Sequence, residues 1–407
     1  MRQVTGSMLR ELRQWADIGL RAVSRRSGGK VRLSDSHLYR VERGLRPVTP
    51  AVVAAYERAL GMRIDAHTLG EITMDGEPDD ADRRAFQATV ATLAAGIPTG
   101  GLGGEGEQRL LQEVTYTRRP RQVTAADVNH LERAASTLRT LDLRHGGELT
   151  CQMAGQLLRW AVNQRTATMT APVRHCWHAA LATLAMWGAW SAHDACQRPG
   201  ARAFAVLALD AAARANEPDL RAHALADIAA QHNHHGHPDD ALHTLRLADG
   251  DERTSPAVQC ILHGVRGRAH AALGERDRCV REIKLIEDLV AGVQPDAVPG
   301  WLGGWHPAHV PAVIGHAHAD LARTTGELDQ LDQAHQLLTT AAEQLAPTRP
   351  RAAALCLTHL AHTHYHHGNP DRATTLTEHA RHLATDLRSA RLNRDLAALQ
   401  GSPDGDR

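Results

Sequence analysis

The sequence has few aromatic residues and almost no lysine. Phe, Trp and Tyr make up 3% of the 407 residues, and because strands are enriched in aromatic and β-branched side chains, this scarcity disfavours a β-rich fold. Only Lys30 and Lys284 are lysines, so arginine supplies nearly all of the positive charge. Alanine and leucine are abundant and favour helices, and we therefore expect an all-α chain.

The sequence also lacks the patterns of disulfide-rich, membrane and exported proteins. Its six cysteines are scattered, with no C-x-x-C pair and no spacing typical of a zinc site, so we expect free thiols in a reducing cytoplasm. No run approaches the roughly 18 apolar residues that a membrane helix needs, and the first residues lack the apolar core of an export signal. These absences predict a cytoplasmic protein with no membrane association.

The motifs of common enzyme classes are missing as well. The glycine-rich stretch 100–106 has neither a preceding strand nor a following Lys-Ser/Thr, so it is typical of a flexible linker and not of a phosphate-binding loop. The sequence contains no nucleophile elbow and no carboxylate pair in a catalytic context. We therefore predict a protein that is not an enzyme, with no catalytic residues and no cofactor.

The charge is unevenly distributed along the chain, although its sum is zero. Residues 1–63 contain thirteen Arg or Lys and five Asp or Glu, a net charge of +8. Because the whole chain has 46 residues of each sign, the other 344 residues carry −8. Duplex DNA attracts a basic module through the release of condensed counterions, and it repels an acidic one. This asymmetry predicts a small DNA-binding head and an acidic body that stays clear of the phosphates.

The basic head shows a series of short helical patterns. A first helix has Met8, Leu12 and Trp15 on one face, and a second runs from about residue 20 to 27. A closing helix begins with Pro50 at its first position and with the preceding threonine as its cap. Together these patterns predict a compact helical domain.

A third helix of the head has separate apolar and polar faces. Ser34 is placed to cap its first turn, because a serine hydroxyl accepts from amides that have no intrahelical acceptor. Leu38 and Val41 lie three residues apart and face the core, which leaves the polar side chains on the opposite face. We expect this polar face to be the functional surface.

The residues Leu38, Val41, Glu42 and Gly44 resemble the pattern x-L-x-x-[IV]-E-x-G that ends the recognition helix of XRE-type, phage-repressor-like helix-turn-helix domains. The resemblance implies that the third helix enters the major groove of double-stranded DNA, where its polar side chains face base edges and flanking arginines and lysines reach phosphates. The implied DNA-binding residues are Ser34, Asp35, Ser36, His37, Arg40, Arg43, Arg46, Lys30 and Arg32.

From about residue 107 onward, helical patterns alternate with short breaks in a recurring frame. Segments 232–241 and 364–373 are alike: a glycine ends one helix, His237 or Asn369 caps the next, and a proline and an aspartate follow. Small residues recur seven positions before and five and twelve after each glycine, where two helices pack closely. They are Ala229, Ala241 and Ala248 around Gly236, and Ala361, Ala373 and Ala380 around Gly368, with looser copies around Gly274 and Gly326.

This spacing resembles the tetratricopeptide repeat, whose helical hairpins stack into a superhelix with a concave face. The resulting fold class is all-α, with a small helix-turn-helix head followed by a tetratricopeptide-like α-solenoid. We predict the head at 1–70, a linker with one helix at 71–106, the repeat domain at 107–400 and a disordered tail at 401–407. A capping helix is expected from Leu387 to Leu399.

Head and repeats together resemble one-component regulators of high-GC Gram-positive bacteria. They also resemble peptide-sensing quorum regulators, in which asparagine side chains hold a peptide in the repeat groove. The resemblance implies a homodimer that binds double-stranded DNA and responds to a peptide or small-molecule effector. The candidate effector-binding residues are Asn163 and Asn233 for the peptide backbone, and Trp301 and Trp305 in a Gly/Pro-rich break. Trp187 and Trp190 fit core packing instead.

Two alternatives remain open from the residues. The chain has 27 histidines, and His232 with His235, or His362 with His366, lie one helical turn apart and could share a metal ion. Their equivalent positions in two repeats favour a structural role, and we predict no metal. A second class of function is a tetratricopeptide-like scaffold that binds a protein partner and carries a vestigial head.

Overall fold

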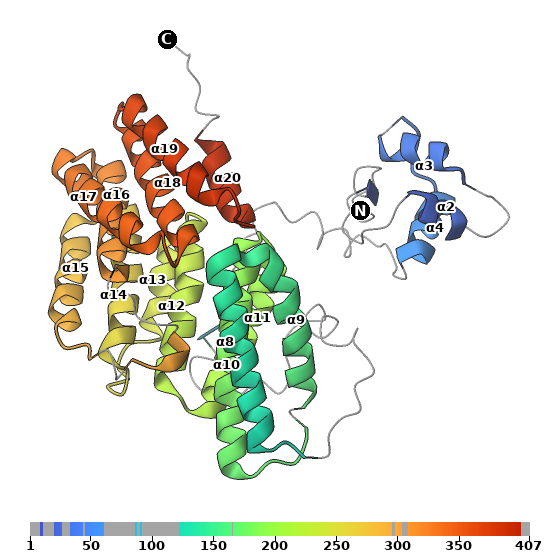
Figure 1. Cartoon of the computed structure of the whole chain (residues 1–407), viewed down its shortest axis with the longest axis horizontal. Helices are drawn as coiled ribbons and strands as arrows, with labels where there is room; N and C mark the ends of the chain where they lie inside the picture. The colour runs from blue at the N-terminus through green and yellow to red at the C-terminus, as the bar shows by residue number, and fades with distance from the viewer. Residues whose placement is uncertain are drawn as a thin grey trace. The chain divides into compact units, whose positions relative to one another are not determined.

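The computed structural model describes residues 9–10, 20–26, 33–43, 45–60, 86–87, 90–91, 122–164, 166–294, 298–302 and 308–399. The chain divides into two compact units, Met1–Arg83 and Arg84–Arg407, here named the head and the body. Within the described residues every named element is helical (Figure 1), and the only strand-like pairing is an isolated bridge between Gln122 and Thr168. The expected all-α class is confirmed.

The head contains α2 (Leu20–Arg26), α3 (Asp35–Glu42) and α4 (Pro50–Leu60). Their apolar side chains meet in one small core, in which Leu38 and Val41 of α3 are fully buried, as the sequence predicts. The apolar face of α3 therefore attaches this helix to the head and leaves its other face to solvent.

Both predicted caps of the head are present. The Ser34 hydroxyl accepts a hydrogen bond from the amide of His37 at 3.2 Å, and the Thr49 hydroxyl accepts from the amide of Val52 at 3.4 Å. Each cap satisfies an amide that the first helical turn leaves without an acceptor. The predicted first helix is described only at residues 9–10, which are helical, and Gly44 lies outside the described residues.

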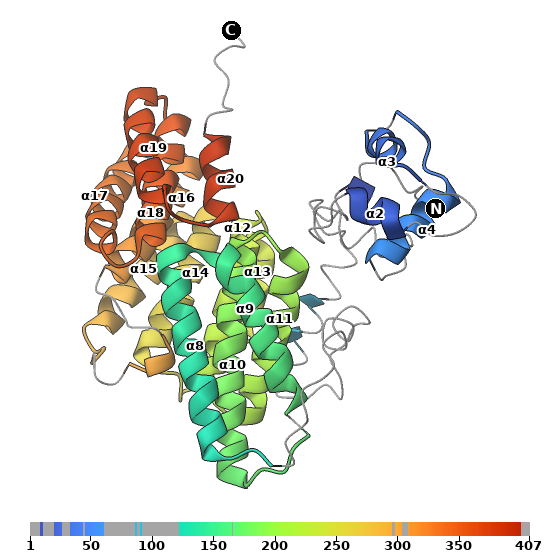
Figure 2. The same ribbon diagram turned by 45° about the vertical axis from the view of Figure 1, so that its right-hand side comes forward.

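The body is built from consecutive helical hairpins (Figure 2). In chain order, these pair α8 (Ala125–His145) with α9 (Gly147–Asn163), α10 (Ala171–Asp194) with α11 (Arg198–Ala215), α12 (Pro218–His234) with α13 (Pro238–Arg246), α14 (Pro256–Ala272) with α15 (Arg276–Val290), α16 (His309–Thr325) with α17 (Leu328–Leu345), and α18 (Pro350–His366) with α19 (Pro370–Ala384). A short 3₁₀ helix, η2 (Gly300–Leu302), precedes α16, and α20 (Ala390–Ala398) is the last described helix.

The predicted hairpin glycines have the conformation that a helix stop requires. The φ angles of Gly236, Gly274, Gly326 and Gly368 lie between 70° and 76°, a region that other residues enter only with strain. The small residues predicted at the close-packing points are buried, among them Ala229, Ala241, Ala248, Ala361, Ala373 and Ala380. The expected α-solenoid is therefore confirmed for the described part of the body.

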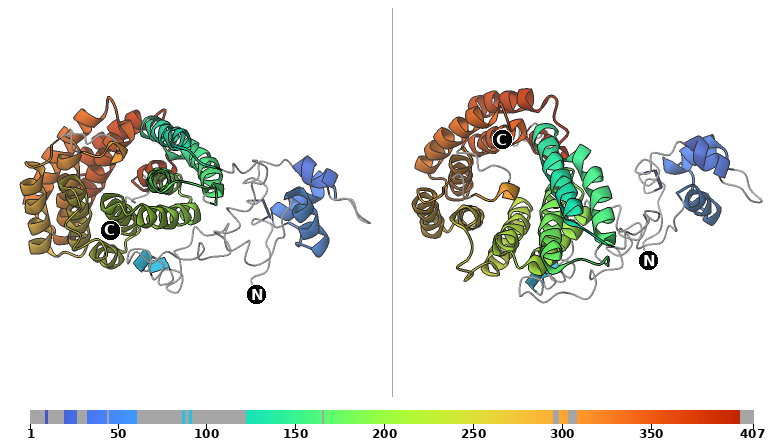
Figure 3. Two further views of the ribbon diagram at one scale, coloured as in Figure 1. Left: turned by 90° about the horizontal axis from the view of Figure 1, so that it is seen from below. Right: turned by 60° about the horizontal axis from the view of Figure 1, so that its bottom comes forward.

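The last helices of the body return to its first hairpins. The helix α18 packs against α8 as well as α17, and α20 contacts α10, α18 and α19. Figure 3 shows the hairpins following one another around a ring, with α18 beside α8. The sequence predicts a superhelix that ends in a capping helix, whereas here the last helix joins the two ends of the solenoid.

A buried ion network holds this junction together. Arg351 of α18 donates hydrogen bonds to Asp194 of α10, at 2.7 Å, and to Asp142 of α8. Arg391 of α20 lies 3.4 Å from the same Asp194 carboxylate, and the Ser389 hydroxyl donates to it at 2.8 Å. Burial alone would raise the pKa of Asp194, but the charges of Arg351 and Arg391 outweigh burial and hold this pKa below its ordinary value.

The backbone closes the same junction. The amide of Arg388 donates to the carbonyl of His145 at 2.7 Å, and the amide of Glu148 donates to the carbonyl of Arg388 at 3.1 Å. Between these bonds, Gly146 has a φ of 93°, and a Cβ on it would lie 2.3 Å from the Arg388 oxygen. Only glycine permits so close an approach of the two segments.

Part of the predicted linker packs on the body. The side-chain nitrogen of Gln87 lies 2.9 Å from Nε2 of His232, and the rings of Phe86 and His232 are 6.1 Å apart. The predicted boundaries at residues 70 and 106 stay predictions, and the predicted tail 401–407 lies outside the described residues. None of the described helices has the length and apolar character needed to cross a membrane.

Candidate nucleic-acid interface

The outward face of α3 carries the side chains that the sequence predicts to face bases. Ser36 and Arg40 are exposed, and Asp35 and His37 are half-buried. A helical turn of 3.6 residues places Ser36 and Arg40 opposite the buried apolar face and the other two at its edges. The structure therefore brings the four residues together on one surface.

The two half-buried residues of this surface each contact an arginine. Nη1 of Arg46 lies 3.1 Å from Nδ1 of His37. Because a guanidinium can only donate, this nitrogen accepts, and the ring proton is placed on Nε2. Asp35 lies 3.7 Å from Arg21 of α2 in an exposed ion pair, which offsets the repulsion between this carboxylate and a phosphate. His37 thus retains an N–H donor, and Asp35 is partly neutralised.

Tyr39 belongs to the same surface, although it is not among the residues predicted from the sequence to face bases. Its side chain is 48% exposed, and the guanidinium carbon of Arg43 lies 5.5 Å from the centre of its ring. Tyr39 follows Ser36 by three residues, and this helical spacing is the signal that identifies it. An exposed aromatic ring beside an arginine offers an apolar contact for a base or sugar.

The predicted phosphate-binding residues are only partly described. Arg43 and Arg46 are exposed at and just beyond the C-terminal end of α3. Lys30 and Arg32 lie outside the described residues. The described arginines flank the polar face of α3, where they can reach phosphates on either side of a groove.

A buried hydrogen bond fixes the C-terminal end of α3. The hydroxyl of Tyr56 in α4 donates to Oε1 of Glu42 at 2.6 Å, and both side chains are buried. A bond to a charged acceptor is short and strong, so it holds α3 against α4. On the other side, the Ser24 hydroxyl of α2 donates to the carbonyl of Leu33 at 2.8 Å. Glu42 and Ser24 therefore orient α3 from within the head.

Three of the candidate effector residues are described, and they belong to different elements of the body. Asn163 ends α9, and the side chain of Asn233 donates to the carbonyl of Val265 in the next hairpin at 2.9 Å. Trp301 is half-buried in η2, with its ring 5.5 Å from that of His223, and Trp305 lies outside the described residues. These assignments stay predictions.

The structure instead places a different tryptophan pair at a cavity. Trp187 and Trp190 of α10 line a cavity of the body, whereas Asn163, Asn233 and Trp301 are not among the residues that line it. Core packing therefore does not fully describe the Trp187 and Trp190 pair, because part of each ring faces this space. Their spacing of three residues places them on one helical face, but the sequence does not show that the face is hollow.

The predicted histidine pairs each contact an arginine. Nδ1 of His235 lies 3.5 Å from Arg198, and burial together with the charge of Arg198 lowers the pKa of His235 to about 3. Nδ1 of His362 accepts a hydrogen bond from Arg323 at 2.9 Å. Across the described residues, no group of three or more His, Cys, Asp or Glu side chains is arranged to hold a metal ion.

Comparison with known families identifies the head. Residues 6–68 match the family model of a helix-turn-helix domain. The comparisons with curated proteins and with solved structures gave no match. The matched range contains α2, α3 and α4 together with the exposed polar face described above. The head is therefore a helix-turn-helix domain, and this supports a DNA-binding regulator.

Proposed function

We propose that this chain is a cytoplasmic, non-enzymatic transcriptional regulator that binds double-stranded DNA in a sequence-specific manner through α3. The observation that carries the proposal is the outward face of α3 in a helix-turn-helix domain: Ser36 and Arg40 are exposed there, the Arg43 guanidinium lies over Tyr39, and the Arg46 guanidinium lies against His37. The major groove is about 12 Å wide and admits a helix, and its base edges have a distinct pattern of donors and acceptors.

The positions of the side chains suggest separate roles. Arg40 is central and exposed, so it contacts base edges, with Ser36 and the Nε2 donor of His37 beside it. Arg43 and Arg46 lie at the end of the helix and contact phosphates, as Lys30 and Arg32 do in the proposed complex. The cap that Ser34 forms holds the first turn of α3 at the DNA surface.

Two substitutions test these roles. We expect Arg40→Ala to reduce affinity for the preferred sequence about 5- to 150-fold and to leave nonspecific binding nearly unchanged, as for loss of a base contact of about 1–3 kcal/mol. Arg43→Ala should weaken binding to every sequence and lower the slope of log K against log salt by about 1. Fluorescence anisotropy with selected and scrambled duplexes at several salt concentrations measures both effects.

Arg133→Ala is the matched control, because Arg133 is exposed on α8 of the body. It should change neither affinity nor salt slope. Identical behaviour of the Arg40 and Arg43 variants would contradict the assigned roles. If the intact chain retards no genomic fragment even at low salt, the alternative of a protein-binding scaffold with a vestigial head is favoured.

We further propose that the head is of the XRE type and that the hairpins are tetratricopeptide-like repeats that mediate homodimerisation and effector sensing. The hairpin glycines and buried alanines support the repeat assignment. A homodimer would place two recognition helices in half-sites about 34 Å apart. Sedimentation of the chain alone, and its binding to DNA with one or two half-sites, tests this arrangement: a monomer that binds both DNAs equally well would contradict it.

A further inference from the structure

A cavity of about 290 Å³ lies where the two ends of the solenoid come together. Some of the described residues that line it belong to α8 and α10 and others to α18 and α20, so the cavity depends on the junction that closes the ring. Its volume is near the lower end of the range of about 300–1,000 Å³ that small-molecule sites occupy. The cavity is therefore large enough for a small organic molecule.

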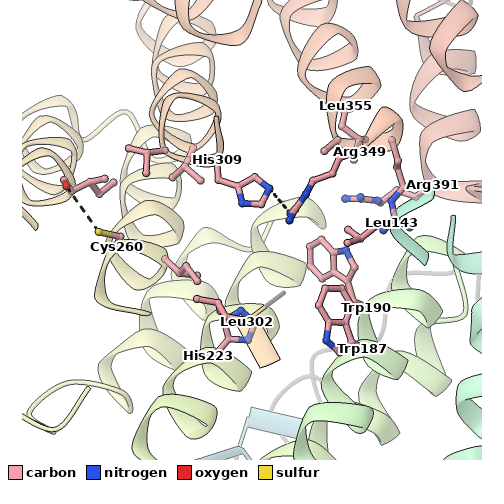
Figure 4. Close-up of a pocket in the computed structure, with 16 residues that line it drawn as sticks. Leu143, Trp187, Trp190, His223, Cys260, Leu302, His309, Arg349, Leu355 and Arg391 are labelled. Atoms are coloured by element: carbon pink, nitrogen blue, oxygen red, sulfur yellow. Dashed lines mark hydrogen bonds between the residues drawn. The ribbon is translucent and has the colours of Figure 1, made fainter. Parts of the chain in front are cut away.

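Most of the described cavity wall is apolar. Figure 4 shows Trp187 and Trp190 of α10 one above the other on one side, and aliphatic side chains such as Leu143, Val313 and Leu355 also line the cavity. Aromatic rings pack on the rings of tryptophan with a gain in energy beyond the area that they bury. This wall fits an apolar molecule, and a flat aromatic one in particular.

The charged side chains of the wall already have partners. Among the described residues that line the cavity there are three arginines and two histidines, and none is Asp or Glu. The charges of Arg351 and Arg391 are balanced by Asp142 and Asp194 of the junction. These two arginines therefore offer no unpaired charge to a ligand.

The other basic residues of the wall have partners as well. Nη1 of Arg349 lies 2.7 Å from Nε2 of His309 (Figure 4), and both residues have further partners. Nδ1 of His223 lies 3.6 Å from the Asp227 carboxylate. Burial raises the pKa of the Cys260 thiol to about 11, so this group is uncharged at neutral pH. A charged ligand would lose its hydration without gaining a free counterion, and the wall therefore favours an uncharged one.

We propose that the cavity binds a small, uncharged, flat aromatic molecule, with its ring system against Trp187 and Trp190. Because this molecule contacts both ends of the solenoid, it stabilises the junction that closes the ring, and the closed body is the ligand-bound state. Binding follows from the cavity itself, whereas its role as the effector site rests on the proposed regulator function.

Calorimetric titration of the full chain with matched probes tests the charge of the ligand. The probes are the neutral 1-naphthylacetamide, the anion 1-naphthylacetate and the cation 2-(1-naphthyl)ethylammonium, which share one ring system. We expect the amide to bind at least about tenfold more tightly than either ion, because neither ion finds a free counterion in the wall. Equal or tighter binding of an ion, or no binding of the amide at millimolar concentration, would overturn the proposal.

A saturated probe tests the contact with tryptophan. The decahydronaphthyl counterpart of the amide has the same carbon skeleton but no flat ring. We expect the aromatic amide to bind about 2- to 10-fold more tightly than this counterpart, and Trp187→Leu should remove most of the preference. Equal binding of the two amides to the natural chain overturns the assignment of an aromatic ligand.

A substitution that fills the cavity locates the binding. Ala352 of α18 lines the cavity, and Ala352→Phe should weaken the aromatic amide at least about tenfold. The matched control Ala126→Phe, on the exposed surface of α8, should not change its affinity. Circular dichroism verifies that each variant folds. If Ala352→Phe does not fold, Trp187→Leu decides, and an unchanged preference for the aromatic amide in that variant overturns the proposed location.

Hydrogen exchange tests the link between binding and closure of the ring. At a concentration of the amide about 100 times its dissociation constant, the opening of α20 should become up to about 100-fold rarer, because only the closed body binds. The amides of α3 and α4 in the head serve as the internal control and should exchange as before. Unchanged exchange in α20 despite binding would mean that the closed body is not the ligand-bound state.

Gel shifts with and without 1-naphthylacetamide separate this inference from the proposed function. If the amide binds but no DNA is retarded, the cavity assignment stands and the regulator proposal fails. If DNA is retarded but the amide does not bind, the regulator proposal stands and the cavity assignment fails. If both bind and the amide leaves DNA affinity unchanged, the effector role is overturned.

Discussion

The head and the body use the same side chain, arginine, in opposite ways. In the head, Arg40, Arg43 and Arg46 are exposed around α3, and the only acid of that face, Asp35, lies at its edge. In the body, Arg351 and Arg391 are buried where the last helices, α18 and α20, meet the first hairpins. Both contact the Asp194 carboxylate. An exposed arginine keeps its charge available to a phosphate, whereas a buried one needs a carboxylate partner to be tolerated.

The same contrast distinguishes the charges proposed to bind DNA at the surface of the head from the charges that stabilise the interior of the body. The affinity of the head depends on charges that salt screens, while the junction of the body depends on charges that salt screens little. If the contrast is correct, removing a charged group should destabilise the protein strongly at the buried junction and weakly at the exposed surface. The following predictions test it, from the largest expected effect to the smallest.

Asp194→Ala should have the largest effect. The substitution removes the carboxylate that Arg351, Arg391 and Ser389 contact and leaves buried cations without it. We expect a loss of about 3–5 kcal/mol in the free energy of unfolding. Urea unfolding followed by tryptophan fluorescence measures the loss, since six of the seven tryptophans belong to the body.

Asp288→Ala is the control for this prediction, because Asp288 forms an exposed pair with Lys284. It should change stability little or not at all. Equal losses for the two variants would show that burial of the junction does not matter, and the contrast between surface and interior charges would fail.

Acidification from pH 7 to pH 5 should destabilise the body by about 2 kcal/mol for each fully buried histidine. Burial, with the nearby charge of Arg391, lowers the pKa of His193 well below its ordinary value of 6.5. The neutral ring therefore stabilises the fold fully above pH 6.5, and this stabilisation is lost as the pH falls toward the folded pKa, because the unfolded chain takes up the proton first.

His193→Phe sharpens this prediction, because a phenyl ring keeps the ring contacts with His234 and His235 and cannot titrate. Urea unfolding at pH 7 and pH 5 should show a smaller difference for the variant than for the natural chain. A pH dependence that is the same in both chains would exclude His193 as a source of the acid sensitivity.

Tyr56→Phe should destabilise the head by about 1–2 kcal/mol, because the buried Glu42 loses a hydrogen bond. Hydrogen exchange of the α3 and α4 amides in the full chain measures this local effect. Tyr39→Phe is the matched control, since the Tyr39 side chain is half-exposed, and it should leave the exchange unchanged. Unaltered protection in Tyr56→Phe would mean that Glu42 does not fix α3.

Loss of the Ser34 cap should have the smallest effect, and a second serine cap in the body serves as its comparison. Ser34 caps α3 at the surface, whereas Ser389 caps α20 and also donates to Asp194 inside the body. We expect Ser34→Ala to cost about 1 kcal/mol and Ser389→Ala about 2 kcal/mol or more, since a buried acceptor also loses a donor. Hydrogen exchange in each unit measures both, and a larger loss from Ser34→Ala would reverse the proposed contrast.

Much of the local structure could be predicted from the residues because helix signals act over a few positions. The cap at Ser34, the buried pair Leu38 and Val41, and the positive φ of Gly236 and Gly368 all depend on neighbours within one or two helical turns. The polar face of α3 follows from the same spacing. Tyr39 was missed although this spacing also identifies it, since an aromatic residue there is equally compatible with the core.

The cavity beside Trp187 and Trp190 could not be predicted in this way. Trp187 and Trp190 occupy one helical face, and a buried face looks the same in sequence whether it contacts side chains or a hollow. The partners of Arg351 illustrate the same limit: Asp142 and Asp194 are 209 and 157 residues away in sequence. No short-range sequence pattern links residues this far apart, and a single Asp or Arg in a sequence is most often a surface residue.

The sequence by itself determined that this chain is helical, where its hairpins turn and which face of α3 is exposed, because short-range hydrogen bonding and apolar periodicity set these features. Only the tertiary structure decided that the solenoid of the body closes on itself, with α18 and α20 against α8 and α10. Closure depends on the sum of small rotations between successive hairpins, and that sum also brings the distant charges of the junction together and forms the cavity beside Trp187 and Trp190.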